Sequence, residues 1–542
     1  MRFADALMRF PAVGILLVTG LAAQTPIPPQ DQPSGGELIR RGSEAPEPRM
    51  ETLNVVVLDN HGQSVTDLTA DDFQVTDGGK PLAISYFHVN NAKTYARREA
   101  ATKPQEFSNG FGVRAPGATV ILLDFLNLGF GARGMAVNNI EHQLPQMESA
   151  NSLYLYIVSV DGMLLPVRGV PRSNPGLPNA PPSEQPEPAS RPWTQRIKPL
   201  LDSAVQAVTR IRNIDIDVFV RTRLTFQVLD SLGAQLEAIP GRKNVIWVTD
   251  GVPIELGYRR SDTGMPIDFT PEMRTLSDAL DRSYVALYPV RQIMLGRSDN
   301  IGEMSGGAGA TYDHGTGLES IATLDLLADL TGGRRTTDKD VGAAVQQSTR
   351  DLAFSYQIGF YASPENWDDN FHKLRITTKR KGAHVQAKSG YYAWKYAAGN
   401  RSWDAFMATA AAPNDAEEIG IRATVEADQA SRSALRVNIL IDGQDVWMVR
   451  EGDHYAGHLR VMAVGYASDG KSSSAAPQSF DVRLSAAERE HAIRDGISFT
   501  LLLPEAQNLS RFKVMVFDRS SNGVGSITIP MTASGLPSNI HK

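Results

Sequence analysis

The sequence predicts an α/β protein in which a doubly wound sheet is inserted into a small β-sandwich, with an all-β sandwich following at the C-terminal end. Three observations support this class. Between residues 118 and 350, short apolar runs alternate with segments whose apolar residues recur at helical spacing. Before and after that stretch, apolar runs follow one another without helical segments, which is typical of antiparallel β-structure. The length of 542 residues also exceeds that of one ordinary domain.

The first 23 residues have the pattern of a secretory signal peptide. Arg2 and Arg9 precede an apolar stretch of small residues at 13–23. This stretch is shorter than a bilayer span, and no cysteine follows it to carry a lipid. We therefore expect an exported protein, periplasmic or extracellular, with no transmembrane anchor after cleavage. The alternative is an N-terminal helix of a cytosolic protein. Residues 24–50 are rich in proline and predict a disordered leader.

Charge and composition exclude several classes of function. The net charge is −6, and the 54 basic residues are scattered, which argues against a nucleic-acid partner and against a polybasic membrane patch. The chain has no cysteine. Disulfides, thiol nucleophiles and cysteine-bound metal centres are therefore ruled out.

Two strand-rich blocks, residues 51–92 and 351–395, flank the central part of the chain. The predicted strands are 53–58, 72–76, 82–89, 354–361, 372–379 and 384–392. Three strands cannot bury enough surface to fold alone. We therefore expect the blocks to be two halves of one sandwich, because a domain can be inserted cheaply where chain ends lie close together. Two unconnected hairpin appendages are the alternative.

Residues 115–350 predict the α/β domain, with a sheet of about six strands. Its strongest strand signal is an apolar, β-branched and aromatic run at 245–249, followed by Asp250 and Gly251. A second run at 118–123 ends at Asp124. Since parallel strands of such sheets present ligand sites beyond their carboxyl ends, we expect both aspartates at one functional edge.

Two further features of this region interrupt the parallel pattern. The Asp161-Gly162 pair is a hairpin signal, so one antiparallel strand is expected. Residues 166–192 are rich in proline without periodicity and predict an exposed loop. The C-terminal part, 400–535, shows alternating apolar residues and predicts a separate β-sandwich. That sandwich has no chemical signature, and we expect it to provide an interaction surface.

Four sequence blocks together resemble the von Willebrand factor A (VWFA)-related domain family of the acidobacterial type. They are LNVVVLDNHGQSVTDLTADDFQVTDGGKPLAISYF at 53–87, VILLDFLN at 120–127, GRKNVIWVTDG at 241–251 and YQIGFYASPENWDDNFHKLRITTKRKGAHVQAKSGYYA at 356–393. The resemblance covers 53–393 and implies a Rossmann-like von Willebrand factor A (VWA) domain.

The resemblance also implies a metal-ion-dependent adhesion site that holds Mg²⁺ for a protein partner. The matching metal ligands are Asp124, Thr225 and Asp250, with Thr222 as a competitor for the threonine position. Mg²⁺ prefers hard oxygen ligands, which suits these side chains. However, Leu126 and Leu128 stand where the family has serines, so the site is degenerate. The alternative is that Asp124 and Asp250 cap loop amides.

The sequence contains none of the common catalytic motifs. Ser305 lies in a glycine-rich loop, which favours a loop over a nucleophile. We therefore predict a non-enzymatic, adhesion-type protein that binds a protein partner through Asp124, Asn127, Thr225, Asp250 and Gly251, where Asn127 could offer its carbonyl. The alternatives are a secreted hydrolase with a site in loops 161–193 and 291–317, and a structural envelope component.

Overall fold

The structure, a computed structural model, describes most of the chain within one compact unit, Gly35–Lys542. The described residues are 37–40, 50–91, 106–109, 117–143, 153–169, 193–210, 217–236, 241–256, 267–291, 314–336, 341–362, 367–394, 409–410, 415–428, 434–467, 472–474, 477–503, 509–521 and 523–532. The predicted signal peptide, most of the predicted leader and proline-rich loop, and Ser305 lie outside them. None of the helices in these ranges is both long enough and apolar enough to cross a membrane.

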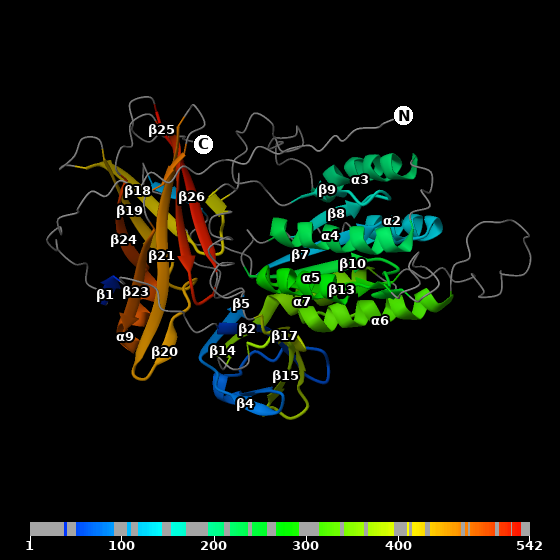
Figure 1. The fold of residues 1–542 in the computed structure, drawn as a ribbon, viewed down its shortest axis with the longest axis horizontal. Coiled ribbons are helices and arrows are strands. Elements are labelled where there is room, and N and C mark those ends of the chain that lie inside the picture. The colour runs from blue at the N-terminus through cyan, green and yellow to red at the C-terminus, as the bar shows by residue number, and fades with distance from the viewer. Residues whose placement is uncertain are drawn as a thin grey trace, which may run out of the picture. The chain divides into compact units, whose positions relative to one another are not determined.

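Strands dominate the described residues, which form 26 strands in six sheets and only seven α-helices. The predicted α/β class, with a doubly wound, Rossmann-like VWA fold, is therefore wrong (Figure 1). The alternation of strands and helices that suggested it is confined to the middle of the chain. Most strands belong to the sheets formed by the regions before and after that stretch, and the protein is mostly β.

The sheet in the middle of the chain has five strands rather than about six. Its order is β13-β10-β7-β8-β9, and all neighbours are parallel except the β8–β9 hairpin. The antiparallel strand expected after Asp161-Gly162 is thus confirmed as β9. The bounds are β7 (Gly117–Asp124), β8 (Leu153–Val158), β9 (Leu164–Arg168), β10 (Arg242–Val248) and β13 (Val285–Val290). A two-stranded sheet, β11 (Glu255–Leu256) and β12 (Ile267–Asp268), follows β10.

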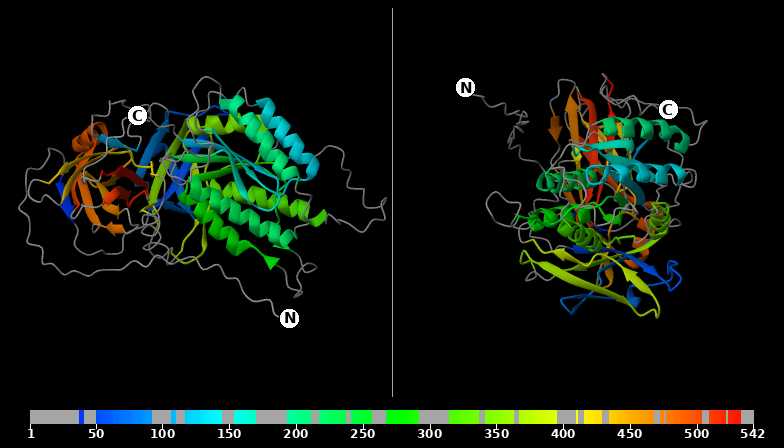
Figure 2. Two further views of the ribbon diagram at one scale, coloured as in Figure 1. Left: turned by 90° about the horizontal axis from the view of Figure 1, so that it is seen from above. Right: turned by 90° about the vertical axis from the view of Figure 1, so that its right-hand side faces the viewer.

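Helices cover this sheet because its central strands are apolar on both faces. Ile121 and Leu123 of β7 belong to a core shared with α2, α3 and α7, whereas Val120 and Leu122 belong to one shared with α4, α5 and α6. Helices thus lie on both faces of the sheet (Figure 2). The helices are α2 (Phe130–Gln143), α3 (Trp193–Arg210), α4 (Val218–Leu236), α5 (Thr270–Arg282), α6 (His314–Thr331) and α7 (Val341–Ala353). All eight residues of β7 are buried, as a strand covered on both faces requires.

Strands from before and after the middle of the chain pair with one another in two four-stranded sheets. The sheet orders are β16-β2-β14-β5 and β17-β15-β3-β4. The elements are β2 (Met50–Leu58), η1 (Ala70–Asp72), β3 (Phe73–Asp77), β4 (Lys80–Leu82), β5 (Tyr86–Asn91), β14 (Phe354–Tyr361), β15 (Phe371–Thr378), β16 (His384–Gln386) and β17 (Gly390–Tyr392). The two sheets share one core that includes Val55, Val75 and Ile358.

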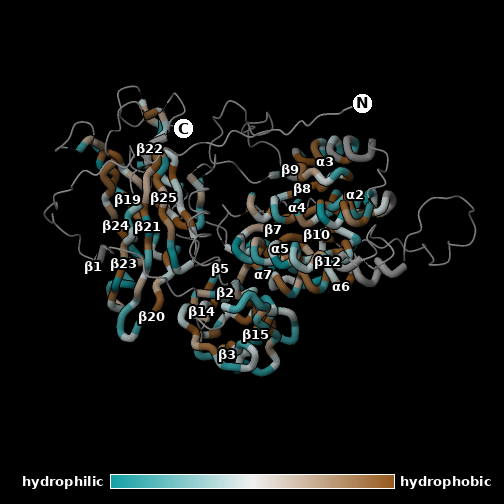
Figure 3. The backbone as a smooth tube through the Cα atoms, viewed as in Figure 1, coloured by the Kyte–Doolittle hydropathy of each residue, from teal (hydrophilic) through white to brown (hydrophobic). Residues whose placement is uncertain are grey.

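The last two sheets hold the C-terminal strands and enclose a core that includes Val437, Leu459 and Val514. The orders are β1-β23-β21-β25-β26, with β20 and β22 beside β21, and β24-β19-β18-β6. Hydrophobic stretches in the strands alternate with hydrophilic turns (Figure 3). The elements are β18 (Ile421–Ala427), β19 (Leu435–Ile441), β20 (Val449–Glu451), β21 (His454–Ala467), β22 (Ser472–Ser474), β23 (Gln478–Leu484), α9 (Ala486–Asp495), β24 (Ile497–Leu503), β25 (Leu509–Asp518) and β26 (Val524–Pro530).

Two strands of these C-terminal sheets come from the N-terminal part of the sequence. They are β1 (Glu37–Arg40), which pairs with β23, and β6 (Glu106–Ser108), which pairs with β18. β1 lies within residues 24–50, for which the sequence predicts a disordered leader. Edge pairing uses backbone groups, so it needs no apolar alternation that a sequence pattern would reveal.

Candidate functional site

The strands β7, β8, β10 and β13 are parallel, so their carboxyl ends lie along one edge of the five-stranded sheet. We call it the carboxyl edge; it comprises Asp124, which is the last residue of β7, and residues 159–163, residues 249–251 and Arg291, which directly follow β8, β10 and β13. In the register of β7 and β10, Leu123 lies opposite Val248. Asp124 and Asp250 therefore stand at the same edge of neighbouring strands, as two apolar runs ending on acids would suggest.

The Asp124 carboxylate is buried, and both of its oxygens accept hydrogen bonds. Its side chain is 1% exposed. Oδ2 accepts from Asn127 Nδ2 at 2.6 Å, Trp247 Nε1 at 3.0 Å and Thr249 Oγ1 at 2.8 Å, and Oδ1 accepts from the Asn127 backbone N–H at 3.2 Å. Burial raises the pKa of Asp124, and these hydrogen bonds to its charged form oppose that rise. The group is thus a structural anchor for the loop after β7.

Asn127 links Asp124 to helix α4 through its amide nitrogen. Nδ2 also donates to Thr225 Oγ1 at 2.8 Å, and this hydroxyl in turn donates to the Arg221 carbonyl at 2.8 Å. The sequence-based expectation was a contribution from the Asn127 carbonyl. In the structure Oδ1 is buried and has no hydrogen-bond partner among the described residues.

Thr225, rather than its competitor Thr222, reaches the carboxyl edge. Thr222 is completely buried, and its hydroxyl donates to the Val218 carbonyl at 2.8 Å within α4. The hydroxyl of Thr225 also bonds back to its own helix, but it accepts a hydrogen bond from Asn127 as well. The two threonines are three residues apart and are therefore neighbours on the helix surface, but only Thr225 contacts Asn127.

Asp250 and Gly251 shape the neighbouring loop. The half-buried Asp250 carboxylate accepts a hydrogen bond from the backbone N–H of Gly129, the residue directly before α2. Burial raises its pKa to about 6, although the nearby Arg291 and Arg221 guanidinium groups oppose this. Gly251 has a φ of 81°, and a Cβ there would lie 3.0 Å from Leu324 Cγ. A side chain at position 251 is therefore disfavoured by backbone strain and by crowding.

The contacts of both aspartates are those of loop caps, the alternative to metal ligation weighed from the sequence. Asp124 accepts from the Asn127 N–H, and Asp250 accepts from the Gly129 N–H. Such bonds satisfy backbone donors that would otherwise be buried without partners.

The residues at this edge do not fit a resident Mg²⁺ ion. Leu126 and Leu128 are 6% and 2% exposed and pack into the two cores, where an ion's hydroxyl ligands would have to stand. Among the described residues there is no group of three or more His, Cys, Asp or Glu side chains placed to hold a metal. Between Asp124 and Thr225 stands a hydrogen-bond donor, the Asn127 amide. An N–H₂ group cannot be a ligand of a cation.

Trp247 and Thr249 were not identified from the sequence, although each donates to Asp124. Trp247 lies in the apolar part of β10, in which no alternation shows which side chains face which layer, and Thr249 directly follows that strand. A signal was present in the polar character of Thr249, which directly precedes the candidate Asp250.

Arg221 and Arg291 lie close enough to Asp250 for their charges to affect its pKa. Both side chains are half-buried, and the Nε atom of each is buried without a hydrogen-bond partner among the described residues. Nearby on α4 and in the β8–β9 turn, Val220 is 44% exposed and Met163 is 59% exposed. The edge therefore combines cationic groups with unused donors and exposed apolar side chains.

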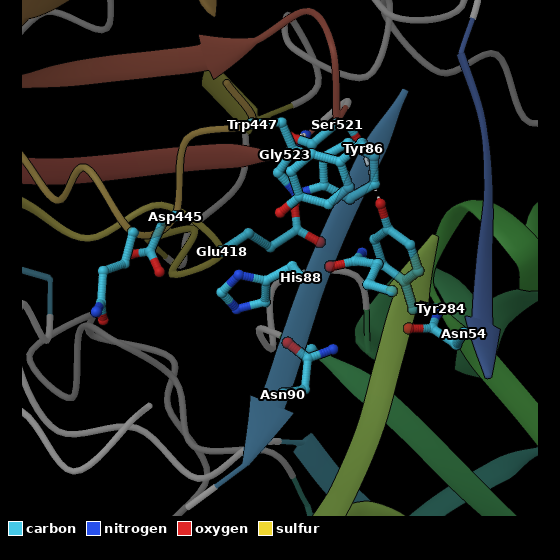
Figure 4. Close-up of a pocket in the computed structure, with 13 residues that line it drawn as sticks. Asn54, Tyr86, His88, Asn90, Tyr284, Glu418, Asp445, Trp447, Ser521 and Gly523 are labelled. Carbon is cyan, nitrogen blue, oxygen red and sulfur yellow. Dashed lines mark hydrogen bonds between the residues drawn. The ribbon is translucent and has the colours of Figure 1, made fainter. Parts of the chain in front are cut away.

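A separate polar pocket is lined by residues of the β16-β2-β14-β5 sheet and by loop residues next to other strands (Figure 4). Tyr86 stacks on Trp447 with ring centroids 4.0 Å apart, and the Tyr284 hydroxyl donates to the Ser521 carbonyl at 3.0 Å. Burial lowers the pKa of His88 to about 4, so its imidazole is neutral at pH 7. Tyr86 and Trp447 are 8% and 5% exposed, so little of either ring is open to a ligand.

Comparison of the chain with models of known protein families gives no match, and no curated protein sequence matches it.

Proposed function

We propose that this chain is an exported, non-enzymatic protein that binds a protein partner at the carboxyl edge of its five-stranded sheet. The observation that carries the proposal is that the Nε donors of Arg221 and Arg291, which lie near Asp250, are buried and have no hydrogen-bond partner in the part of the chain that the structure describes. A buried donor without a partner costs free energy that a ligand's acceptor would recover. The resemblance of the sequence blocks to the VWFA-related family supports the same choice of function.

The composition of this edge favours a protein segment that carries a carboxylate next to an apolar side chain. Guanidinium groups recognise carboxylates by paired hydrogen bonds. Val220 and Leu224 are one helical turn apart, and a Cβ on Gly162, next to Met163, would lie 3.1 Å from a Leu224 methyl carbon. Arg and Met are enriched in protein–protein interfaces. We infer that the partner's carboxylate meets the arginines while its apolar side chain covers Met163 and Val220.

A non-enzymatic role is favoured because the carboxylate of Asp124 already accepts hydrogen bonds from neighbouring residues. Asp124 accepts four hydrogen bonds and is 1% exposed, so it has neither a free lone pair directed at solvent nor access to a substrate. The rival hydrolase would use loops 161–193 and 291–317, most of which lie outside the described residues.

The test is crosslinking in the native host from a photoreactive residue at Val220, with a second probe at Leu502, which is 40% exposed on β24. A protein captured from position 220 and not from 502 is then purified, and its affinity is measured. Arg221→Glu should weaken binding about tenfold or more, because a charge that pairs with the partner is reversed. Arg223→Glu, an exposed position on the same helix, should leave the affinity unchanged. Equal affinities for both variants would refute the proposal.

A further inference from the structure

We propose that the Asn127 carboxamide occupies the place of a cation between Asp124 and Thr225, so that the carboxyl edge is organised without metal. Removing this amide should create a divalent-cation site. The inference concerns the construction of the edge and stands whether or not a partner binds there.

The Asn127 amide nitrogen lies between two oxygens that could bind a cation. Nδ2 lies 2.6 Å from Asp124 Oδ2 and 2.8 Å from Thr225 Oγ1, so it is in hydrogen-bond contact with two oxygens from separate elements. Mg²⁺ lies about 2.0–2.1 Å from its oxygen ligands. A cation that used these two oxygens would need the space that Nδ2 fills, and the amide and the ion exclude each other.

The two oxygens, Asp124 Oδ2 and Thr225 Oγ1, both direct lone pairs at the Asn127 amide. The Thr225 hydroxyl proton is directed to the Arg221 carbonyl, which leaves a lone pair of Oγ1 for Asn127. All four contacts of the Asp124 carboxylate are donors, which favours its ionised form. Both oxygens thus present lone pairs to one point, as ligands of a hard cation do. The amide supplies two N–H groups at that point instead of an ion.

A carboxylate at position 127 should favour the binding of a divalent cation. In Asn127→Asp an oxygen replaces Nδ2 within about 3 Å of Asp124 Oδ2, and two like charges at this separation repel strongly. A divalent cation relieves the repulsion, since Mg²⁺ binds through one or two carboxylates and keeps several waters. The variant should therefore need a cation where the wild type does not.

Thermal unfolding of the full chain in chelator, in millimolar Mg²⁺ and in millimolar Mn²⁺ tests the inference, with calorimetric titration of Mn²⁺ alongside. The wild type should have the same Tm in all three conditions and no binding heat. Asn127→Asp should have a lower Tm in chelator, a rise of several degrees in Mn²⁺ and one binding site, because a ligand of the folded state stabilises it. Asn138→Asp, the same change at an exposed position of α2, should show no metal response.

Asn127→Ala covers the case in which the aspartate variant does not fold. It vacates the space without adding charge, so Mn²⁺ should still raise its Tm through Asp124 and Thr225. A wild type whose Tm falls in chelator would overturn the inference. So would folded variants at position 127 whose Tm is the same in chelator and in Mn²⁺.

Discussion

At the scale of single residues, the carboxyl edge depends on how the buried Asp124 carboxylate is held. Its neighbours are two donors from the loop after β7 and two from β10 and the residue that follows it. Because these donors come from adjacent strands, the acid joins the two strand ends. A buried carboxylate is tolerated only when its oxygens are satisfied, so each donor should matter for stability.

Thr249→Ala should lower the free energy of unfolding by about 1–3 kcal/mol, because Asp124 Oδ2 loses one of its three donors and Asp124 is 1% exposed. Gly251 also loses its acceptor, since its N–H donates to Thr249 Oγ1 at 2.9 Å. Urea denaturation of both chains measures the difference. Thr275→Ala is the matched control, because Thr275 is exposed and its hydroxyl bonds only within α5. Losses of equal size in the two variants would contradict this role for Thr249.

Asp250 should give the edge a dependence on pH. Burial raises its pKa from 3.8 to about 6, against the opposing charges of Arg291 and Arg221 and with a small contribution from Asp124. The folded state therefore binds the proton more tightly than the unfolded state. The resulting stabilisation is complete below about pH 4 and is lost as the pH rises through about 6.

Asp250→Asn removes this titration, so the wild type should lose stability relative to the variant between about pH 4 and pH 7. Denaturation at a series of pH values measures the difference. For Asp230→Asn, on the exposed side of α4, the free energy of unfolding should change with pH as it does in the wild type. If the free energy of unfolding of Asp250→Asn also changes with pH as it does in the wild type, the shifted pKa of Asp250 is refuted.

At the scale of elements, the sequence could predict which strands end on acids but not how the acids are used. Uniformly apolar runs identify buried strands, and β7 and β10 are neighbours with the two aspartates at one edge. The same uniformity hides the orientation of each side chain, so Trp247 and Thr249 were missed. The choice between Thr222 and Thr225 depends on the rotation of α4, which sequence spacing alone did not fix.

Helix α9 was missed although its sequence carried a start signal. Ser485 caps the helix by accepting from the Glu488 N–H at 3.3 Å, and Glu488 accepts from the Ser485 N–H at 2.8 Å. This reciprocal capping box is recognisable as Ser-x-x-Glu. The surrounding strand patterns outweighed it, because only Ala492 of the helix is buried and no apolar face was visible.

Ser485→Ala should destabilise the chain by about 1 kcal/mol, because the first turn of α9 loses its side-chain cap. Chemical denaturation monitored by circular dichroism measures this. Ser498→Ala, at an exposed position of β24, should have little effect. An unchanged midpoint for Ser485→Ala would show that the capping box contributes nothing to stability.

At the scale of the whole molecule, the two edges of the five-stranded sheet differ in whether their arginine side chains find hydrogen-bond partners within the described chain. At the amino end of β10, Arg242 is 3% exposed and donates to the Gly332 carbonyl at 2.7 Å, the Tyr288 hydroxyl at 3.1 Å and the Asn54 carbonyl at 3.4 Å. Its polar groups are thus satisfied within the chain. At the carboxyl edge, Arg221 and Arg291 each keep an unpartnered Nε among the described residues. This contrast is why the proposed contact lies at the carboxyl edge.

The class of the whole chain was predicted wrongly because one region was taken to represent all of it. Periodicity in the middle of the chain indicated strands and helices correctly, but strands contributed by β1 and β6 join sheets near the other end of the sequence. Such long-range pairing leaves no local pattern.

The affinity of the wild-type chain for the partner captured from position 220, measured first in chelator and then in millimolar Mg²⁺, tests the account most directly. We predict the same Kd in both conditions and a Kd about tenfold higher for Arg221→Glu. Binding that disappears in chelator, or that is unaffected by charge reversal at both Arg221 and Arg291, would contradict a metal-free, arginine-lined contact edge.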